Sequence, residues 1–150
     1  MSLEQQMNDG IKTAMKSKND ADLRSFRAIK AAILIAKTSG DYKGELTEAD
    51  EVKILQKLAK QRQDSLDIFR QQHREDLAGI EEEELNVIRR FLPAQMDAQQ
   101  LREALGKIIA DTGASSPADM GKVMGVATKK LAGRADGKTI SAVVRELLNR

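Results

Sequence analysis

Residues 20–36 read DADLRSFRAIKAAILIA, and this stretch decides the fold class. At about 100° per residue, its large apolar side chains cover most of the circumference of a helix. A helix that is apolar on nearly all sides is typical of a protein core, so we expect it to be central, with other helices around it. Asp20 is the predicted N-cap, and the apolar side chains belong to Leu23, Phe26, Ile29, Ile33, Leu34 and Ile35.

The rest of the chain has the composition of a helical protein. Alanine, leucine, lysine, arginine, glutamate and glutamine are strong helix formers, and together they make up 80 of the 150 residues. Ser2 is the predicted N-cap of a first helix. Thr47 and Asp50 form a predicted capping box for a long third helix that ends near Gln72. We therefore predict an all-α protein.

Pro93 marks a predicted boundary between two helical domains. Its ring disfavours the helical conformation at Leu92, so a fourth helix, which follows a break at residues 73–75, is expected to end there. We predict an N-terminal helical domain of about four helices over residues 1–92. A small three-helix domain is predicted over residues 97–150, where Asp97 starts a helix and Gly113 ends it.

The composition excludes several classes of site. The chain has no cysteine and a single histidine, so disulfides, thiolate or histidine metal sites and cysteine nucleophiles are excluded, and we expect no metal or cofactor. Four aromatic residues are too few for stacking RNA bases along aromatic rows. No apolar run approaches the ~18 residues of a membrane span, and the polar N-terminus is unlike a signal peptide. We expect a cytoplasmic protein without membrane contact.

The net charge of +2 is unevenly distributed along the chain. Residues 1–96 carry 16 basic and 17 acidic side chains, a net charge of −1, whereas residues 97–150 carry 9 and 6, a net charge of +3. Helical spacing places the cations of the last two helices opposite apolar stripes, where an RNA phosphate backbone can reach them. The alternative is an ordinary solvated helix surface. The candidate residues are Lys122, Lys129, Lys130, Arg134, Lys138 and Arg145.

Three glycines accompany these cations. Gly121 and Gly125 either let a neighbouring helix approach closely, the commoner use of this spacing, or keep a ligand-facing surface flat. Gly133 is predicted to end their helix. The segment 132–139, AGRADGKT, also fits a relaxed phosphate-binding loop, but that loop needs a β-strand before it. We predict a turn between two helices instead, with Asp136 as the next N-cap.

The other candidate catalytic groups have structural explanations. His73 lies at a predicted helix junction without a nucleophile partner, which favours a solvated or capping role. Consecutive helical residues point about 100° apart, so the glutamates at 81–84 cannot share a proton and are predicted to form a solvated face. Arg62 occupies a seam position of the third helix, where we expect an ion pair with Glu81 or Glu84; ligand binding is the alternative. No catalytic residue is predicted.

Several short motifs lie between residues 60 and 137. They are KQR at 60–62, FLP at 91–93, TGA at 112–114, DMGKVMG at 119–125 and GRADG at 133–137. In order and spacing they resemble the GatB/YqeY family, specifically its stand-alone YqeY-like members. The first helix and the loop at residues 38–46 are the least characteristic parts.

The resemblance implies an N-terminal helical domain followed by a three-helix domain. The latter is similar to the C-terminal tail of the B subunit of the glutamine-dependent aspartyl/glutamyl-tRNA amidotransferase. In that enzyme the helical and tail regions hold tRNA, while the chemistry belongs to other domains. The implied family label is a carbon–nitrogen ligase with glutamine as amido-N-donor. The residues of this chain show no site for that reaction, and we expect no amide transfer by the chain alone.

The expected function is non-catalytic binding of tRNA or another structured RNA, linked to amidotransferase biology. The six cations would release counterions from the phosphate backbone and read shape more than sequence, and no DNA is expected as a ligand. The three glycines would permit close backbone approach. The alternative is a helical protein-interaction module that docks on an amidotransferase, a synthetase or a ribosome-associated partner in aminoacyl-tRNA metabolism. An exposed apolar patch on the N-terminal helices would favour this alternative.

Overall fold

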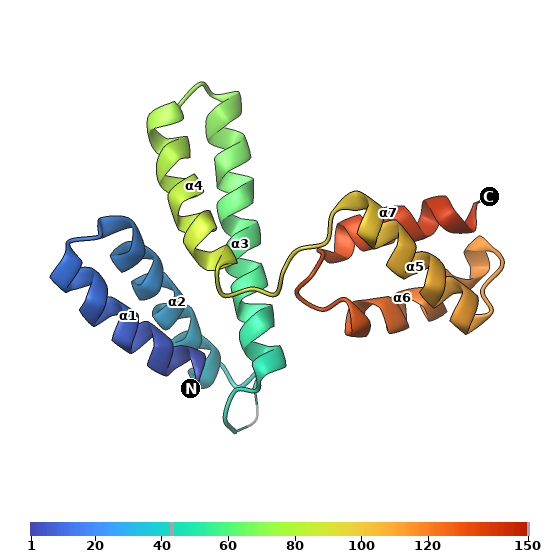
Figure 1. Cartoon of the computed structure of the whole chain (residues 1–150), viewed down its shortest axis with the longest axis horizontal. Helices are drawn as coiled ribbons and strands as arrows, with labels where there is room; N and C mark the ends of the chain where they lie inside the picture. Colours follow the sequence, from blue (N-terminus) through green and yellow to red (C-terminus); the bar gives the residue numbers. More distant parts are fainter. Residues whose placement is uncertain (43, 150) are drawn as a thin grey trace. The chain divides into compact units, whose positions relative to one another are not determined.

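The computed structural model describes residues 1–42 and 44–149, which form helices joined by short loops (Figure 1). The predicted all-α class is confirmed, because these residues contain no strand. Two residues of the predicted segments lie outside the described residues. They are Lys43, in the predicted loop at residues 38–46, and Arg150, in the predicted C-terminal domain. The helices are α1 (Leu3–Ser17), α2 (Asp20–Thr38), α3 (Glu48–Gln71), α4 (Glu75–Arg89), α5 (Ala98–Thr112), the short 3-10 helix η1 (Pro117–Asp119), α6 (Met120–Lys130) and α7 (Gly137–Leu148).

Side-chain caps determine where several helices begin. Ser2, Thr47 and Asp97 each accept a hydrogen bond from the backbone N–H three residues later. The side chain of that later residue accepts a bond from the N–H of the cap in return, which makes three complete capping boxes. Gly113 follows α5 with a φ of 72°, the left-handed conformation that suits glycine. The three predicted starts and the predicted end at Gly113 are confirmed. The fourth helix ends at Arg89, before the predicted Leu92, because the N–H groups of residues 90–92 bond to carbonyls three residues earlier in a tighter turn.

The cap of α2 differs from the prediction by one residue. Asn19 accepts a hydrogen bond from the N–H of Asp22, and Asp20 is the first residue of the helix. The preceding residue, Lys18, ends α1 with a φ of 56°. This left-handed residue turns the chain so that Asn19 takes the extended conformation that an N-cap requires. The prediction of Asp20 as the cap is therefore wrong.

The N-terminal unit, Met1–Leu92, consists of two helical hairpins, α1 with α2 and α3 with α4 (Figure 1). Each of the four helices contributes to one core, with Met7, Ile29, Leu55 and Ile88 almost inaccessible to solvent. Full burial of a side chain of this size contributes about 1.5–3 kcal/mol. The two hairpins are therefore held together mainly by apolar burial.

Helix α2 is central in this unit, but neighbouring helices do not cover it on all sides. It packs against α1, α3 and α4, and its residues Phe26, Ile29 and Ile33 are buried. Leu34 and Ile35, which were expected in the core, are 45% and 67% exposed. The predicted central position of this helix is confirmed, but the three neighbouring helices do not cover the side that carries Leu34 and Ile35.

The second compact unit begins at Pro93 and contains α5, α6 and α7. These helices surround their own core, in which Leu105, Val123, Ala127 and Val144 are fully buried. The apolar stripe predicted around residues 120–131 is therefore a core-facing surface. The opposite side of α6 faces solvent, which determines where its lysines lie.

Gly10 in α1 is required by a close packing contact. A Cβ at this position would lie 2.8 and 2.9 Å from two ring carbons of Phe26, whose ring also makes an edge contact with Phe91. We expect Gly10→Ala to lower the free energy of unfolding by about 1–3 kcal/mol, although alanine has the better helix propensity. Chemical denaturation followed by circular dichroism measures the change.

Gly79 in α4 offers a matched control. A Cβ at this position meets nothing within 4 Å. Gly79→Ala should therefore raise the free energy of unfolding by about 0.5–1 kcal/mol through helix propensity alone. Stabilisation of similar size by both substitutions would show that the Phe26 contact does not constrain α1.

Candidate nucleic-acid interface

Two short helices of the C-terminal unit carry the predicted RNA-binding cations. Ahead of α6, the Asp119 carboxylate accepts hydrogen bonds from the backbone N–H groups of Ser115 and Ser116, at 3.0 and 3.4 Å. These bonds hold the pKa of Asp119 below its ordinary value. Ahead of α7, Asp136 accepts a bond of 2.7 Å from the N–H of Thr139 and is the N-cap, as predicted. Both helices therefore start at carboxylates that are engaged with backbone.

Five of the six predicted cations are exposed on these helices. Among the described residues of this unit, Arg102 and Glu146 form an ion pair at 2.9 Å. None of the five exposed cations has a carboxylate within ion-pair distance among these residues. Exposure by itself also fits a solvated helix surface. The missing carboxylate partners leave these charges available to an anion. They belong to Lys122, Lys129 and Lys130 on α6 and to Lys138 and Arg145 on α7.

Arg134, the sixth cation, lies in the turn between α6 and α7 and is only partly exposed. Its Nε donates a hydrogen bond to the carbonyl of Ala94 at 3.2 Å, and its own carbonyl accepts one from the N–H of Met96 at 3.0 Å. These two bonds join the segment before α5 to the turn. Arg134 therefore has a structural role, which the sequence did not indicate.

The three glycines have two different environments. Gly121 and Gly125 are exposed, and a Cβ at either position meets nothing within 4 Å. The helix-packing interpretation of this pair is therefore wrong, because no neighbouring helix approaches them. Gly133 is buried in the turn with a φ of 79°, and its carbonyl accepts a hydrogen bond from Nε2 of Gln95 at 2.6 Å. The prediction that Gly133 ends α6 is wrong, because the helix ends at Lys130 and Gly133 shapes the turn that follows.

Lys107 was not among the predicted residues. It is exposed on α5 and lines a shallow hollow of about 270 Å³ together with Arg134 and Glu103. The other basic residue of α5, Arg102, lies five positions away and does not share its face. With no second cation at helical spacing, the sequence carries no signal that distinguishes Lys107 from an ordinary surface lysine.

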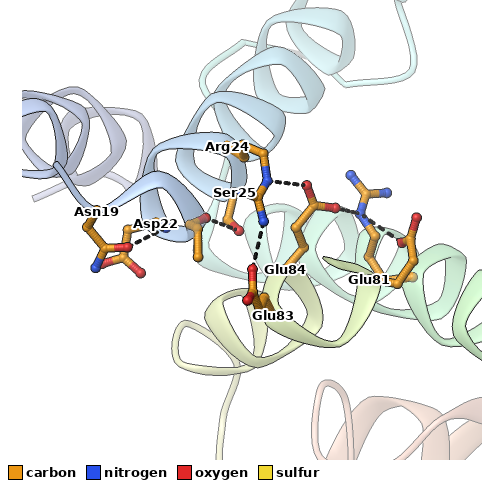
Figure 2. A network of polar contacts seen from close by, with 9 residues as sticks. Asn19, Asp22, Arg24, Ser25, Glu81, Glu83 and Glu84 are labelled. Atoms are coloured by element: carbon orange, nitrogen blue, oxygen red, sulfur yellow. Dashed lines mark hydrogen bonds and ion pairs between the residues drawn. The ribbon is translucent and has the colours of Figure 1, made fainter. Parts of the chain in front are cut away.

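A second polar cluster lies in the N-terminal unit, where α2, α3 and α4 meet (Figure 2). Glu84 bridges two arginines: its Oε2 accepts a hydrogen bond from Nε of Arg62 at 2.9 Å, and its Oε1 lies 3.6 Å from Nε of Arg24. Arg24 also pairs with Glu83 at 2.8 Å, and Arg62 with Glu81 at 3.8 Å. The predicted ion pair of Arg62 is confirmed. Because the cluster joins three helices, we assign it a structural role.

The glutamates at 81–84 do not form one solvated face. Glu82 and Glu83 are exposed, but the side chains of Glu84 and Glu81 are only 15% and 21% exposed. The prediction is wrong for the latter pair, because both lie on the side of α4 that meets Arg62. Burial raises the pKa of Glu81, with Arg62 acting in the opposite direction and the nearby charge of Glu84 adding to the rise.

The remaining catalytic and metal candidates are readily placed. His73 is exposed in the turn between α3 and α4, with a φ of 57°. The segment 132–139 covers the turn after α6 and the first residues of α7, so the predicted helix–turn–helix arrangement is confirmed. Within the described residues, no group of three or more histidine, aspartate or glutamate side chains is arranged to hold a metal ion. Nor is any described helix both long and apolar enough to cross a membrane.

The motifs of the chain agree with a comparison to known protein families. A family described as "Yqey-like protein" matches residues 4–148. The chain belongs to this YqeY-like family. The resemblance inferred from the motifs is thus confirmed over nearly the whole sequence, including the segments that carry the cations of α6 and α7.

Three fungal proteins named "Altered inheritance of mitochondria protein 41, mitochondrial" are similar to this YqeY-like chain. The protein of Clavispora lusitaniae is 37% identical over 98 residues, which cover 63% of this chain and 55% of that protein. The protein of Pyrenophora tritici-repentis is 30% identical over 142 residues, 92% of this chain and 76% of that protein. The protein of Meyerozyma guilliermondii is 31% identical over 109 residues, 69% and 56% respectively.

The chain spans just over half the length of two of these relatives. Their names describe them as mitochondrial, and those names specify no ligand or reaction. The cytoplasmic location of this YqeY-like protein therefore stays a prediction. Its ligand has to be argued from its own residues.

Glu84→Gln tests whether the polar cluster holds the three helices together. Glutamine keeps the size of the side chain but removes the charge that faces Arg24 and Arg62, so the free energy of unfolding should fall by about 1–2 kcal/mol. Glu82→Gln is the control, because the Glu82–Arg70 pair is about half exposed and should contribute less than about 1 kcal/mol. Urea denaturation measures both, and equal losses would contradict a special role for Glu84.

Glu81 should make stability fall as the pH rises. Its pKa in the folded chain is raised above the ordinary value of 4.5, so its contribution is complete at lower pH and is lost as the folded carboxyl ionises. The free energy of unfolding of the native protein, relative to that of Glu81→Gln, should therefore decrease as the pH rises above the ordinary value of 4.5. Urea denaturation at several pH values checks the sign, and a difference that increases with pH would contradict it.

Proposed function

We propose that this YqeY-like protein binds tRNA or another structured RNA without catalysing a reaction on it, through α6 and α7. The observation that carries the proposal is that five exposed cations of these two helices have no carboxylate within ion-pair distance among the described residues of their unit. A phosphate backbone supplies the anions that these cations lack.

The acidic residues of this unit support the proposal by being engaged elsewhere. Residues 97–150 contain six acidic side chains. Asp97 and Asp136 cap helices, and Asp119 accepts backbone hydrogen bonds before α6. Glu146 pairs with Arg102. Four of the six carboxylates are therefore committed to contacts within the protein itself, and none of the six forms an ion pair with the exposed cations of α6 and α7 among the described residues.

The surface of α6 suits contact with a backbone rather than with bases. Lys122 and Lys129 are seven residues apart, two helical turns, and therefore lie on the same face. Gly121 and Gly125 lie on the same helix without side chains, and no other part of the described chain fills the space beside them. A phosphate–sugar backbone can therefore approach α6 closely, and with few aromatic residues to stack bases, recognition would depend mainly on RNA shape.

The turn between α6 and α7 contributes the remaining predicted residues. Gly133 shapes this turn, Lys130 is the last residue of α6 before it, and Arg134 lies within it. Lys138 and Arg145, seven residues apart on α7, again share one face. The link to amidotransferase biology is part of the proposal, and it rests on the similarity of the motifs at 112–114, 119–125 and 133–137 to the tail of the amidotransferase B subunit.

RNA binding of this kind should depend strongly on salt. If about four phosphates are contacted, the logarithm of the association constant should fall with the logarithm of the salt concentration at a slope of about −3 to −4, because each contact releases a counterion. A filter-binding titration with deacylated tRNA at several salt concentrations measures the slope. The proposal is wrong if no salt-sensitive binding occurs even at low ionic strength.

Charge reversal distinguishes tRNA binding by the lysines of α6 from general electrostatic attraction between tRNA and the protein. Lys122→Glu with Lys129→Glu should lower the affinity for tRNA by at least tenfold and reduce the salt slope, because two phosphate contacts are lost. The control is Lys12→Glu with Lys16→Glu, which reverses two exposed lysines of α1 and changes the net charge by the same amount. Equal losses in the two double variants would contradict a specific role for α6.

A further inference from the structure

A groove of about 470 Å³ lies between α2 and α3 in the N-terminal unit. Its α2 wall is formed by small apolar residues and one large one, Ala28, Ala31, Ala32, Ala36 and Ile35. Its α3 wall consists of two rows spaced four residues apart: Lys53, Lys57 and Gln61 form one row, and Ile54, Leu58 and Arg62 form the other. Ridges spaced four residues apart are the surface against which a further helix packs.

Four of the five apolar residues that α2 contributes to the groove are alanines. The two helices join through the loop that contains Tyr42, which lines one end of the groove. Ile35, on the α2 wall, is the most exposed large apolar side chain of α2. Covering this aliphatic side chain with a partner is favourable, because each Å² of apolar surface removed from water contributes about 25 cal/mol of free energy.

The charge along the α3 edge indicates the chemistry of the occupant. Lys53 and Lys57 are exposed, one turn apart on the same side of α3, and neither forms an ion pair within the described residues. Asp50 lies one turn before Lys53, but its carboxylate accepts a hydrogen bond from the N–H of Thr47 in the helix cap. Asp41 is the acidic residue that lines the groove itself. The edge therefore has a surplus of positive charge beside an apolar wall.

We propose that this groove binds an amphipathic α-helix of a partner protein, whose apolar face covers Ile35 and the alanines and whose acidic flank lies along Lys53 and Lys57. Residues 53–62 extend for about 13 Å, which matches two to three turns of the bound helix. Acidic residues four positions apart on that helix have the spacing of the two lysines. This is the helix-in-groove mode of recognition, with charge setting the orientation.

An acidic helix fits the groove better than a nucleic acid does. A phosphate backbone would satisfy the lysines, but it would leave Ile35 and the alanines uncovered. The inference develops the alternative of a protein-interaction module, and it is independent of the RNA-binding proposal because it uses residues of the N-terminal unit only. A second copy of this chain is the competing occupant, and the test distinguishes it.

The groove contains its own spectroscopic probe. Tyr42 is the single tyrosine of the chain, and there is no tryptophan, so tyrosine fluorescence reports on this position alone. The probe ligand is a synthetic 18-residue helical peptide without aromatic residues, with alanine and leucine on one face and glutamates four residues apart on one flank. We expect saturable changes in Tyr42 emission on titration. The matched peptide with lysines in place of the glutamates should bind at least tenfold more weakly.

Paired variants identify the surface that binds. Lys53→Glu with Lys57→Glu should weaken binding of the acidic peptide at least tenfold, whereas Lys122→Glu with Lys129→Glu should leave it unchanged. Ile35→Asn should also weaken it, and Ile68→Asn, which changes an isoleucine of similar exposure on α3 outside the groove, should not. Circular dichroism confirms that each variant is folded before it is titrated.

Three results would overturn the proposal. The first is the absence of a saturable response to the acidic peptide at concentrations up to about 1 mM. The second is equal binding of the acidic and basic peptides, or binding that Lys53→Glu with Lys57→Glu does not change. The third is a dimer in sedimentation analysis that Ile35→Asn dissociates, because the groove would then be an interface between two copies. Filter binding with tRNA is unaffected by any of these outcomes, so the two proposals fail separately.

Discussion

Burial of one face of α2 is the constraint on which the N-terminal unit depends. Ile29 and Ile33 are almost inaccessible, and they share a core with residues of the other three helices. Helix α1 does not cover this face alone, and the α3–α4 hairpin packs against α2 as well. The same docking leaves Ile35 and Ala31 exposed beside α3. The core and the proposed peptide groove are therefore two consequences of one arrangement, in which α2 has more apolar surface than its neighbours cover.

The polar cluster around Glu84 complements this apolar core at its edge. Ion pairs between exposed side chains contribute little, but Glu84 and Arg62 are largely removed from solvent and are hydrogen-bonded to each other. Because Glu84 also faces Arg24, movement of α2, α3 or α4 past the others would separate partly buried charges. The cluster therefore favours a particular packing of the helices, whereas apolar burial alone is less selective about register.

The C-terminal unit uses its charged residues differently. Its aspartates are mostly engaged at helix starts, where a carboxylate satisfies backbone N–H groups that have no partner within the helix. The exposed cations of α6 and α7 are left without a carboxylate within ion-pair distance among the described residues. A nearly balanced composition can thus present an unbalanced surface, because the carboxylates are occupied by the backbone while the lysines are not.

The sequence by itself determined the all-α class, the caps at Ser2, Thr47 and Asp97, and the family, because helical periodicity, capping and short motifs depend on residues close together in the chain. It also indicated the partners of Arg62, since a cation at a seam position requires a nearby acid. Only the tertiary structure decided that Gly121 and Gly125 are uncovered, that Glu81 and Glu84 are partly buried, and that Ile35 faces a groove. The physical reason is that burial depends on which distant segments pack against a residue, and a local pattern shows which side of a helix is apolar without showing how much of it will be covered.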